Sequence, residues 1–172
     1  MLTKNLFPRY PIFFLAYLFF TVTLFANNEL IIEIDNPKFS EKGLSDKIYE
    51  IKAKRGLKSN NDLELFTVEG KFKTEKNGKW IYMEAEKGNF SQTNNFIKLE
   101  RNIVFYTNEG EIIKSDQATF DMTNDIIKLS KNVSHESAEG LVIADSSTIT
   151  NSFNSILYEG NVVSTFKNQE ND

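Results

Sequence analysis

Few residues in this chain have side chains that could carry out chemistry. The 172-residue sequence has no cysteine and a single histidine, His135, so it lacks the ligands of a thiolate or histidine-rich metal site. We expect His135 to lie on a strand with its side chain towards solvent. Four aspartates could serve acid–base catalysis or calcium binding, and they are Asp116, Asp121, Asp125 and Asp145.

These aspartates have a structural explanation that needs no catalysis. They recur at turn-like positions, where Asp is favoured because its carboxylate hydrogen-bonds to nearby backbone. The sequence also contains no nucleophile elbow, phosphate-binding loop or dinucleotide fingerprint. We therefore predict that the protein is not an enzyme and uses no metal and no cofactor.

Composition narrows the classes of partner and of fold. The formal net charge is −4 and the lysines are scattered, so the chain has no basic patch for binding nucleic acid. Fifteen Phe and six Tyr stand against one Trp and three Pro, a composition typical of β-rich chains. The composition favours an all-β domain with no nucleic-acid partner.

A repeat predicts the elements that position the rest of the chain. Phe90, Phe120 and Ile149 are each followed, seven residues later, by an alternating apolar segment that continues into an Asn and a further apolar residue. The units are offset by thirty and then twenty-nine residues, which is long enough for two strands with their turns but too short for a duplicated domain. We predict a series of antiparallel hairpins.

Within each hairpin, the alternation of apolar and polar residues determines which side chains lie on the apolar face, and the turn residues determine where the chain reverses. Side chains on a strand alternate between faces, so each repeat puts its apolar residues on one side. Asn102, Asn132 and Asn161 are predicted to make tight reversals, because Asn tolerates left-handed backbone. Gly110 and Gly140 mark further turns. Stacked hairpins of this kind present one continuous apolar face.

Small residues spaced three apart form a second, weaker repeat. They suggest places where neighbouring backbones come close. The first of these pairs, Ala53 and Gly56, extends the repeat back to about residue 48. The dipeptide Asn77-Gly78, between two alternating segments, predicts another hairpin. The small pairs are Ala53 and Gly56, Ala85 and Gly88, Ser115 and Ala118, and Ala144 and Ser147.

The N-terminal segment is predicted to be a membrane anchor. Residues 11–26 carry no charge, and as a helix they would cover about 24 Å of a hydrocarbon core about 30 Å thick. Lys4 and Arg9 precede the segment and acidic residues follow it, which favours a cytoplasmic N-terminus. The best cleavage site, Leu24-Phe25-Ala26, has a bulky Leu where a small residue is preferred. We therefore favour an uncleaved anchor over a cleaved signal peptide.

The order of these features resembles the LptC family, the single-pass inner-membrane components of lipopolysaccharide transport. The resemblance rests on the apolar N-terminal segment, then Asp35-Asn36-Pro37-Lys38-Phe39, then Tyr49-Glu50-Ile51-Lys52-Ala53 and Trp80-Ile81-Tyr82-Met83-Glu84-Ala85, followed by the repeats that contain Asn. It implies an open, twisted β-jellyroll or taco-like fold of repeated antiparallel hairpins, preceded by one N-terminal transmembrane helix.

The resemblance also implies a function, partners and a location. The chain would receive lipopolysaccharide from an LptB/LptF/LptG-type ATP-driven transporter and pass it along an apolar groove to a soluble LptA-like protein. It would sit in the cell inner membrane with its N-terminus in the cytoplasm and its C-terminal domain in the periplasm. The expected organisation is a stub and anchor over 1–26, a connector and first strand over 27–46, the β-domain over 47–166, and a frayed tail over 167–172.

Two sets of residues are the candidate sites. A terminal strand with an unpaired edge could accept a partner's strand by β-augmentation, and its residues are Val162, Ser164 and Phe166. A closed core would use the same residue types as a lipid groove, so the sequence alone leaves both open. Phe90, Phe120 and Ile149 are expected to pack structurally in either case. The lipid-groove candidates are Ile97, Leu99, Ile103, Phe105, Ile127, Leu129, Val133, Ile156, Tyr158 and Val162.

Three other functions remain open at this point. The first is a periplasmic β-repeat adaptor that binds only proteins and has a filled interior. The second is a secreted, LptA-like bridge protein. The third, a glycan-acting β-domain, is disfavoured by the single Trp and by the lack of a paired carboxylate motif.

Overall fold

The structure is a computed structural model that describes residues 30–42, 48–60, 62–73, 78–91, 93–151 and 153–167. This part of the chain is all β, as predicted, and contains eleven strands and no helix. The strands are β1 (Ile32–Asp35), β2 (Lys38–Lys42), β3 (Ile48–Ser59), β4 (Asp62–Lys73), β5 (Trp80–Ser91), β6 (Phe96–Thr107), β7 (Ile112–Asp121), β8 (Ile126–Glu136), β9 (Gly140–Thr150), β10 (Ser155–Glu159) and β11 (Val163–Phe166).

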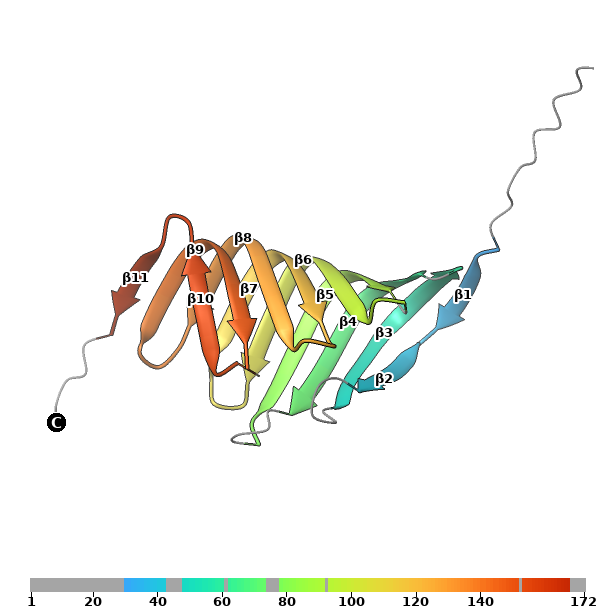
Figure 1. The fold of residues 1–172 in the computed structure, drawn as a ribbon, viewed down its shortest axis with the longest axis horizontal. Helices are drawn as coiled ribbons and strands as arrows, with labels where there is room; N and C mark the ends of the chain where they lie inside the picture. The colour runs from blue at the N-terminus through green and yellow to red at the C-terminus, as the bar shows by residue number, and fades with distance from the viewer. Residues whose placement is uncertain are drawn as a thin grey trace, which may run out of the picture.

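All the strands form one open antiparallel sheet. The order β3 to β10 follows the sequence, so each strand pairs with its chain neighbours. At one end β1 and β2 both pair with β3, and at the other end β10 and β11 both pair with β9. Each end of the sheet is thus completed by two short strands, and β1 and β11 lie at opposite ends of the molecule (Figure 1).

The strand register confirms the predicted hairpin repeat. Phe90 lies directly opposite Ile97, and Phe120 lies directly opposite Ile127. Ile149 and Ile156 form the equivalent pair between β9 and β10. β4 and β5 also pair as antiparallel neighbours, with Lys73 opposite Trp80, as the dipeptide Asn77-Gly78 predicted. Asn77 itself lies outside the described residues, and Gly78 has a φ of 63°.

The three repeated asparagines adopt left-handed backbone, but the predicted reversals at these positions are wrong. Asn102 (φ 49°) and Asn132 (φ 56°) lie in the middle of β6 and β8, and Asn161 (φ 43°) lies between β10 and β11. In β6 and β8 the Asn follows a second residue with positive φ, and the register with both neighbouring strands shifts. Such a bulge bends a strand without reversing it.

These bends align across the sheet in a line that we call the bend row. It runs through Asn36, Thr67, Arg101-Asn102, Lys131-Asn132 and Gly160-Asn161, all of which have positive φ. Each repeated Asn donates from Nδ2 to a carboxylate on the preceding strand. The pairs are Asn102 with Glu86 (2.5 Å), Asn132 with Asp116 (2.6 Å) and Asn161 with Asp145 (2.8 Å).

The small residues spaced three apart flank the same bend row. Ala53 and Gly56 are buried on either side of the bend in β3, and Ala85 and Gly88 occupy the same positions in β5. A Cβ at Gly88 would come within 3.2 Å of Ile97 Cδ1. Small side chains therefore leave room on the inner side of the fold where the two halves of each strand converge.

The bend row divides the sheet into two facing layers (Figure 1). The β10 layer contains the strand segments on the side of β1 and β10, and the β11 layer contains those on the side of β2 and β11. Rings from one layer contact rings from the other. Phe39 and Phe90 stack at 4.7 Å between centroids, and Tyr49 meets Phe120 edge-on at 4.9 Å. The core lies between the layers.

The predicted N-terminal transmembrane helix lies outside the described residues, as do residues 27–29 and 43–46 of the predicted connector. Within the ranges that the structure describes, no helix has the length and apolar character needed to cross a membrane. The described part of the connector, residues 30–42, contains β1 and β2, which pair with β3 and belong to the sheet.

Candidate functional site

The candidate groove residues lie on the inner face, and most of them are fully buried. Ile97, Leu99, Ile103, Phe105, Ile127, Leu129 and Val133 have exposed fractions of 0–3%. They belong to one continuous core that also contains Phe90, Phe120 and Ile149. The sequence left a filled interior and an open groove both open, and along these strands the interior is filled by the chain's own side chains.

Aromatic contacts close the side of this core that faces away from the bend row. Phe72 of the β11 layer contacts Phe120 of the β10 layer at 5.5 Å between ring centroids. Phe153, in the turn after β9, contacts Phe72 and Phe105, each at 5.9 Å. The Tyr49 hydroxyl donates to Asp125 Oδ1 at 2.9 Å, joining β3 to the β7–β8 turn. The middle of the interior is thereby sealed.

The C-terminal end of the interior is less well covered. Ile156 and Tyr158 are only half-buried, although they occupy the same inner face as the sealed residues. Val162 is 47% exposed, and Phe166 is 76% exposed. Cover from the chain's own side chains therefore decreases from the middle of the sheet towards β11.

His135 lies in this C-terminal part, and the prediction that it faces solvent is wrong. It follows Val133 by two residues in β8, so it shares the inner face and is half-buried. Its Nδ1 shares a hydrogen bond with the Tyr158 hydroxyl, and the two rings lie 6.2 Å apart. His135 Nε2 is buried without a hydrogen-bond partner among the described atoms.

Charged groups stand beside the His135–Tyr158 pair. Burial lowers the pKa of His135; Glu111 opposes this shift and Lys79 reinforces it. Burial and Glu111 together raise the pKa of Tyr158. Lys79 forms ion pairs with Glu111 and, at 3.0 Å, with Glu109. Although burial alone would lower it, the bonds to these carboxylates raise the pKa of Lys79.

The partner-edge candidates occupy the end of the sheet. Ser164 and Phe166 belong to β11, which pairs with β9, and Val162 lies in the connection that precedes it. All three are exposed. The opposite end also carries exposed apolar residues, with Leu30 at 74% and Ile31 at 62% exposure just before β1.

The four aspartates serve as turn and bend residues. Asp121 Oδ1 accepts hydrogen bonds from the backbone N–H groups of Thr123 and Asn124 in the β7–β8 turn. Asp116 and Asp145 accept from the Asn residues of the bend row, and Asp125 accepts from Tyr49. In the part of the chain that the structure describes, no group of three or more His, Asp or Glu side chains could hold a metal ion.

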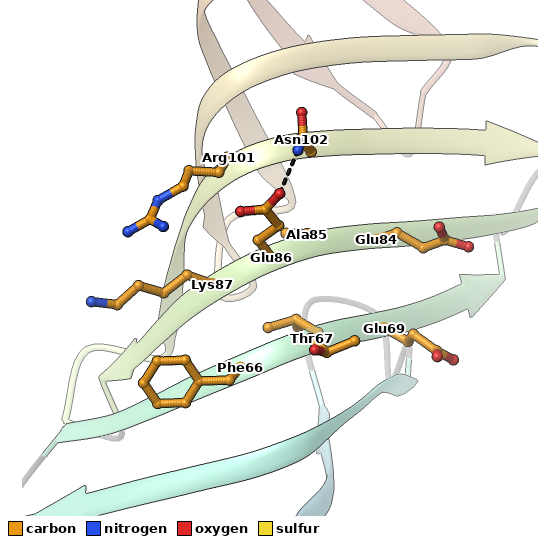
Figure 2. Close-up of a pocket in the computed structure, with 10 residues that line it drawn as sticks. Phe66, Thr67, Glu69, Glu84, Ala85, Glu86, Lys87, Arg101 and Asn102 are labelled. Atoms are coloured by element: carbon orange, nitrogen blue, oxygen red, sulfur yellow. Dashed lines mark hydrogen bonds between the residues drawn. The ribbon is translucent and has the colours of Figure 1, made fainter.

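A hollow on the outer side of the bend row has mixed charge. Figure 2 shows Phe66, Lys87 and Arg101 on one side of it and Glu69 and Glu84 on the other. The Lys87 ammonium lies 5.9 Å from the centre of the Phe66 ring. Because the hollow is lined by both cations and carboxylates, it does not present one sign of charge to a ligand.

Sequence reasoning missed three residues that close the interior, namely Tyr49, Phe153 and His135. Each acts through a partner far away in sequence, as with Tyr49 and Asp125, which are 76 positions apart. The alternation that places Tyr49 and His135 on the inner face was visible in the sequence. The residues that they contact in the opposite layer could not be read from the sequence.

No protein-family model matches the chain, and no curated protein matches it either.

Proposed function

We propose that this protein is an LptC-like, membrane-anchored component of lipopolysaccharide transport. In this proposal it receives lipopolysaccharide from an ATP-driven inner-membrane transporter and passes it to a soluble LptA-like protein. Residues 11–26 supply the anchor, and the β-domain lies in the periplasm. The bent antiparallel sheet is then the open β-jellyroll or taco of that family.

The observation that carries the proposal is the division of the sheet into an apolar inner face and a polar outer face around one bend row. Along β6, for example, Ile97 and Leu99 are buried whereas Lys98 and Glu100 are exposed. A continuous apolar face over several strands can hold an alkyl chain, whose burial is worth about 0.8 kcal/mol per CH₂. The exposed strand edges at both ends suit pairing with neighbouring proteins.

The filled interior means that a bound lipid has to displace the protein's own side chains. That displacement costs least where these side chains are least buried. At the C-terminal end Ile156 and Tyr158 are already half-buried, so the two layers can separate there with less loss of packing than around Phe120. We therefore expect alkyl chains to occupy this end first.

Site-specific crosslinking tests the lipid-binding part of the proposal. A small diazirine residue placed at Leu129 or Ile97 should give adducts with lipopolysaccharide when the full chain is irradiated with it. The exposed neighbours Lys128 and Lys98 serve as matched controls, because they lie on the outer face of the same strands. Equal adduct yields at inner and outer positions, or none at either, would contradict a lipid-binding interior.

A protein-only adaptor is the second candidate, and the burial of the interior favours it. An adaptor would use its strand edges alone, and its core would stay closed. In both cases Ser164→Pro should weaken capture of an LptA-like partner, since Pro cannot donate a backbone hydrogen bond to an added strand. Edge-dependent capture without lipid adducts at Leu129 and Ile97 identifies the adaptor.

The location of the chain is tested separately. N-terminal sequencing of the mature protein should recover the segment before residue 27, as expected of an uncleaved anchor. Recovery of a chain that begins near Asn27 would instead support a secreted, LptA-like bridge protein.

A further inference from the structure

The contact between the two layers changes its chemistry at the C-terminal end of the interior. Around Tyr49, Phe72 and Phe120 the layers meet mainly through aromatic rings. At the C-terminal end the contact is a hydrogen bond between His135 Nδ1 on β8 and the Tyr158 hydroxyl on β10. His135 belongs to the β11 layer and Tyr158 to the β10 layer, so this bond ties the layers together.

The surroundings of this pair make it easier to separate than the middle of the core. Val142, which pairs with His135 across β8 and β9, is only half-buried, and Phe166 on the last strand is 76% exposed. Separating His135 from Tyr158 therefore exposes little apolar surface that is not already exposed. A polar bond between half-buried groups breaks at smaller cost than a packed aromatic cluster.

We propose that His135 and Tyr158 form a gate that holds the two layers together and whose opening admits alkyl chains to the interior. The identity of the ligand as a lipid rests on the proposed function. The opening itself is a property of the fold, and it can be measured without lipopolysaccharide.

Protonation of His135 is expected to open the gate. Protonation would place a positive charge on a half-buried ring whose Nε2–H has no acceptor among the described atoms, and this charge is better solvated in the open state. The charged and titratable groups that face the ring are Glu111, Lys79 and Tyr158, and burial dominates in lowering the pKa of His135. Once opened to solvent, His135 should regain its ordinary pKa of about 6.5.

The sign of the pH effect follows from this difference. A histidine whose pKa is lower in the closed state than in the open state stabilises the closed state at high pH. As the pH falls below about 6.5, the open state binds the proton more readily and gains population. The gate should therefore be closed at pH 8 and open more often at pH 5.5.

Cysteine accessibility can measure the opening because the natural chain has no cysteine. Val133→Cys places a thiol on the inner face two residues before His135, and Val68→Cys places a matched thiol in β4. Both valines are at most 1% exposed. The rate of modification by a small methanethiosulfonate reagent is measured for each variant in the full chain, reconstituted in lipid nanodiscs. The ratio of the rate in Val133→Cys to the rate in Val68→Cys reports opening at the C-terminal end relative to the middle of the sheet, and His135→Phe controls for the pH dependence of the Val133→Cys thiol itself.

In this assay the further change Tyr158→Phe should raise the modification rate in the Val133→Cys chain about fivefold, because one ordinary hydrogen bond is lost. It should leave the rate in the Val68→Cys chain unchanged.

With His135 and Tyr158 both present, the ratio should rise as the pH falls from 8 to 5.5. His135→Phe should raise the ratio and abolish its dependence on pH. An unchanged ratio in Tyr158→Phe, or an equal increase at both positions, would overturn the gate.

The outcome is separable from that of the proposed function. If the accessibility assay shows opening but no lipid adducts form at Leu129, the opening of the layers is supported and lipid is ruled out as the ligand that it admits. Lipid adducts without a change in the accessibility of the Val133→Cys thiol support the lipid conduit and refute the gate.

Discussion

The middle of the interior and its C-terminal end use the same alternating pattern but reach different degrees of closure. In the middle, Phe120 is 2% exposed and contacts two rings from the opposite layer. At the end, Tyr158 occupies the same inner face but is half-buried and bonded to His135. Each middle strand has a full-length partner on both sides, whereas β9 has only β10 and β11 beyond it.

The difference shows that closure here depends on cover from neighbouring strands and turns rather than on the inner-face residues alone. Phe153, from the turn after β9, covers Phe72 and Phe105 in the middle of the molecule. Beyond β11 no further strand is present among the described residues to cover Phe166. An interior that is sealed in the middle and weakly closed at one end suits a protein that takes up or releases material at that end.

The largest expected effect is on the sealed middle. Phe120→Ala should lower the free energy of unfolding by about 3–5 kcal/mol, because it leaves a cavity among rings that cannot all move to fill it. Chemical denaturation of the full chain measures this loss. Phe166→Ala is the control at the C-terminal end, and its effect should be small because the side chain is already exposed. Equal losses for the two variants would contradict the contrast between the regions.

A smaller effect is expected along the bend row. Asn132→Ala should lower the free energy of unfolding by about 1–2 kcal/mol, since Ala disfavours left-handed backbone and the bond to Asp116 is lost. Asn132→Gly keeps the left-handed conformation and should lose less. Asn161→Ala should also lose less, because Asn161 connects two short strands at the edge. Denaturation curves for the three variants test this order, and a reversed order would refute it.

The smallest effect concerns the hydrogen bond from Tyr49 to Asp125, on the side of the core that faces away from the bend row. Tyr49→Phe removes the donor to Asp125 but keeps the ring against Phe120, so the loss should be about 1 kcal/mol. Hydrogen exchange in the β7–β8 turn should increase more than exchange near β11. A larger increase near β11 would show that the two regions do not open independently.

The hairpin repeat could be predicted because it depends on local spacing. Phe90 and Ile97 flank a short turn, and their direct pairing follows from the seven-residue offset between them. The left-handed backbone at Asn102 was also predictable from the residue type. Its bend was mistaken for a reversal, because left-handed backbone occurs in both turns and bulges, and only the register with the neighbouring strand, where Ala85 and Gly88 flank the bend, distinguishes them.

Contacts between the layers could not be predicted from the repeat. Leu129 in a filled core and Leu129 in a lipid groove have the same pattern in sequence, and only the facing layer distinguishes them. The environment of His135 depends on Tyr158, which lies 23 positions further on and in another layer. The prediction that His135 faces solvent failed for that reason.

The bend row has a consequence for how such a molecule can change in size. Each of the three repeated hairpins brings its own corner, built from an Asn, the carboxylate that it contacts and a pair of small residues on the adjoining strand. Adding or removing one hairpin of about thirty residues would preserve every remaining corner. The number of hairpins therefore determines the length of the interior, and both ends of the sheet can keep their structure while the distance between them changes.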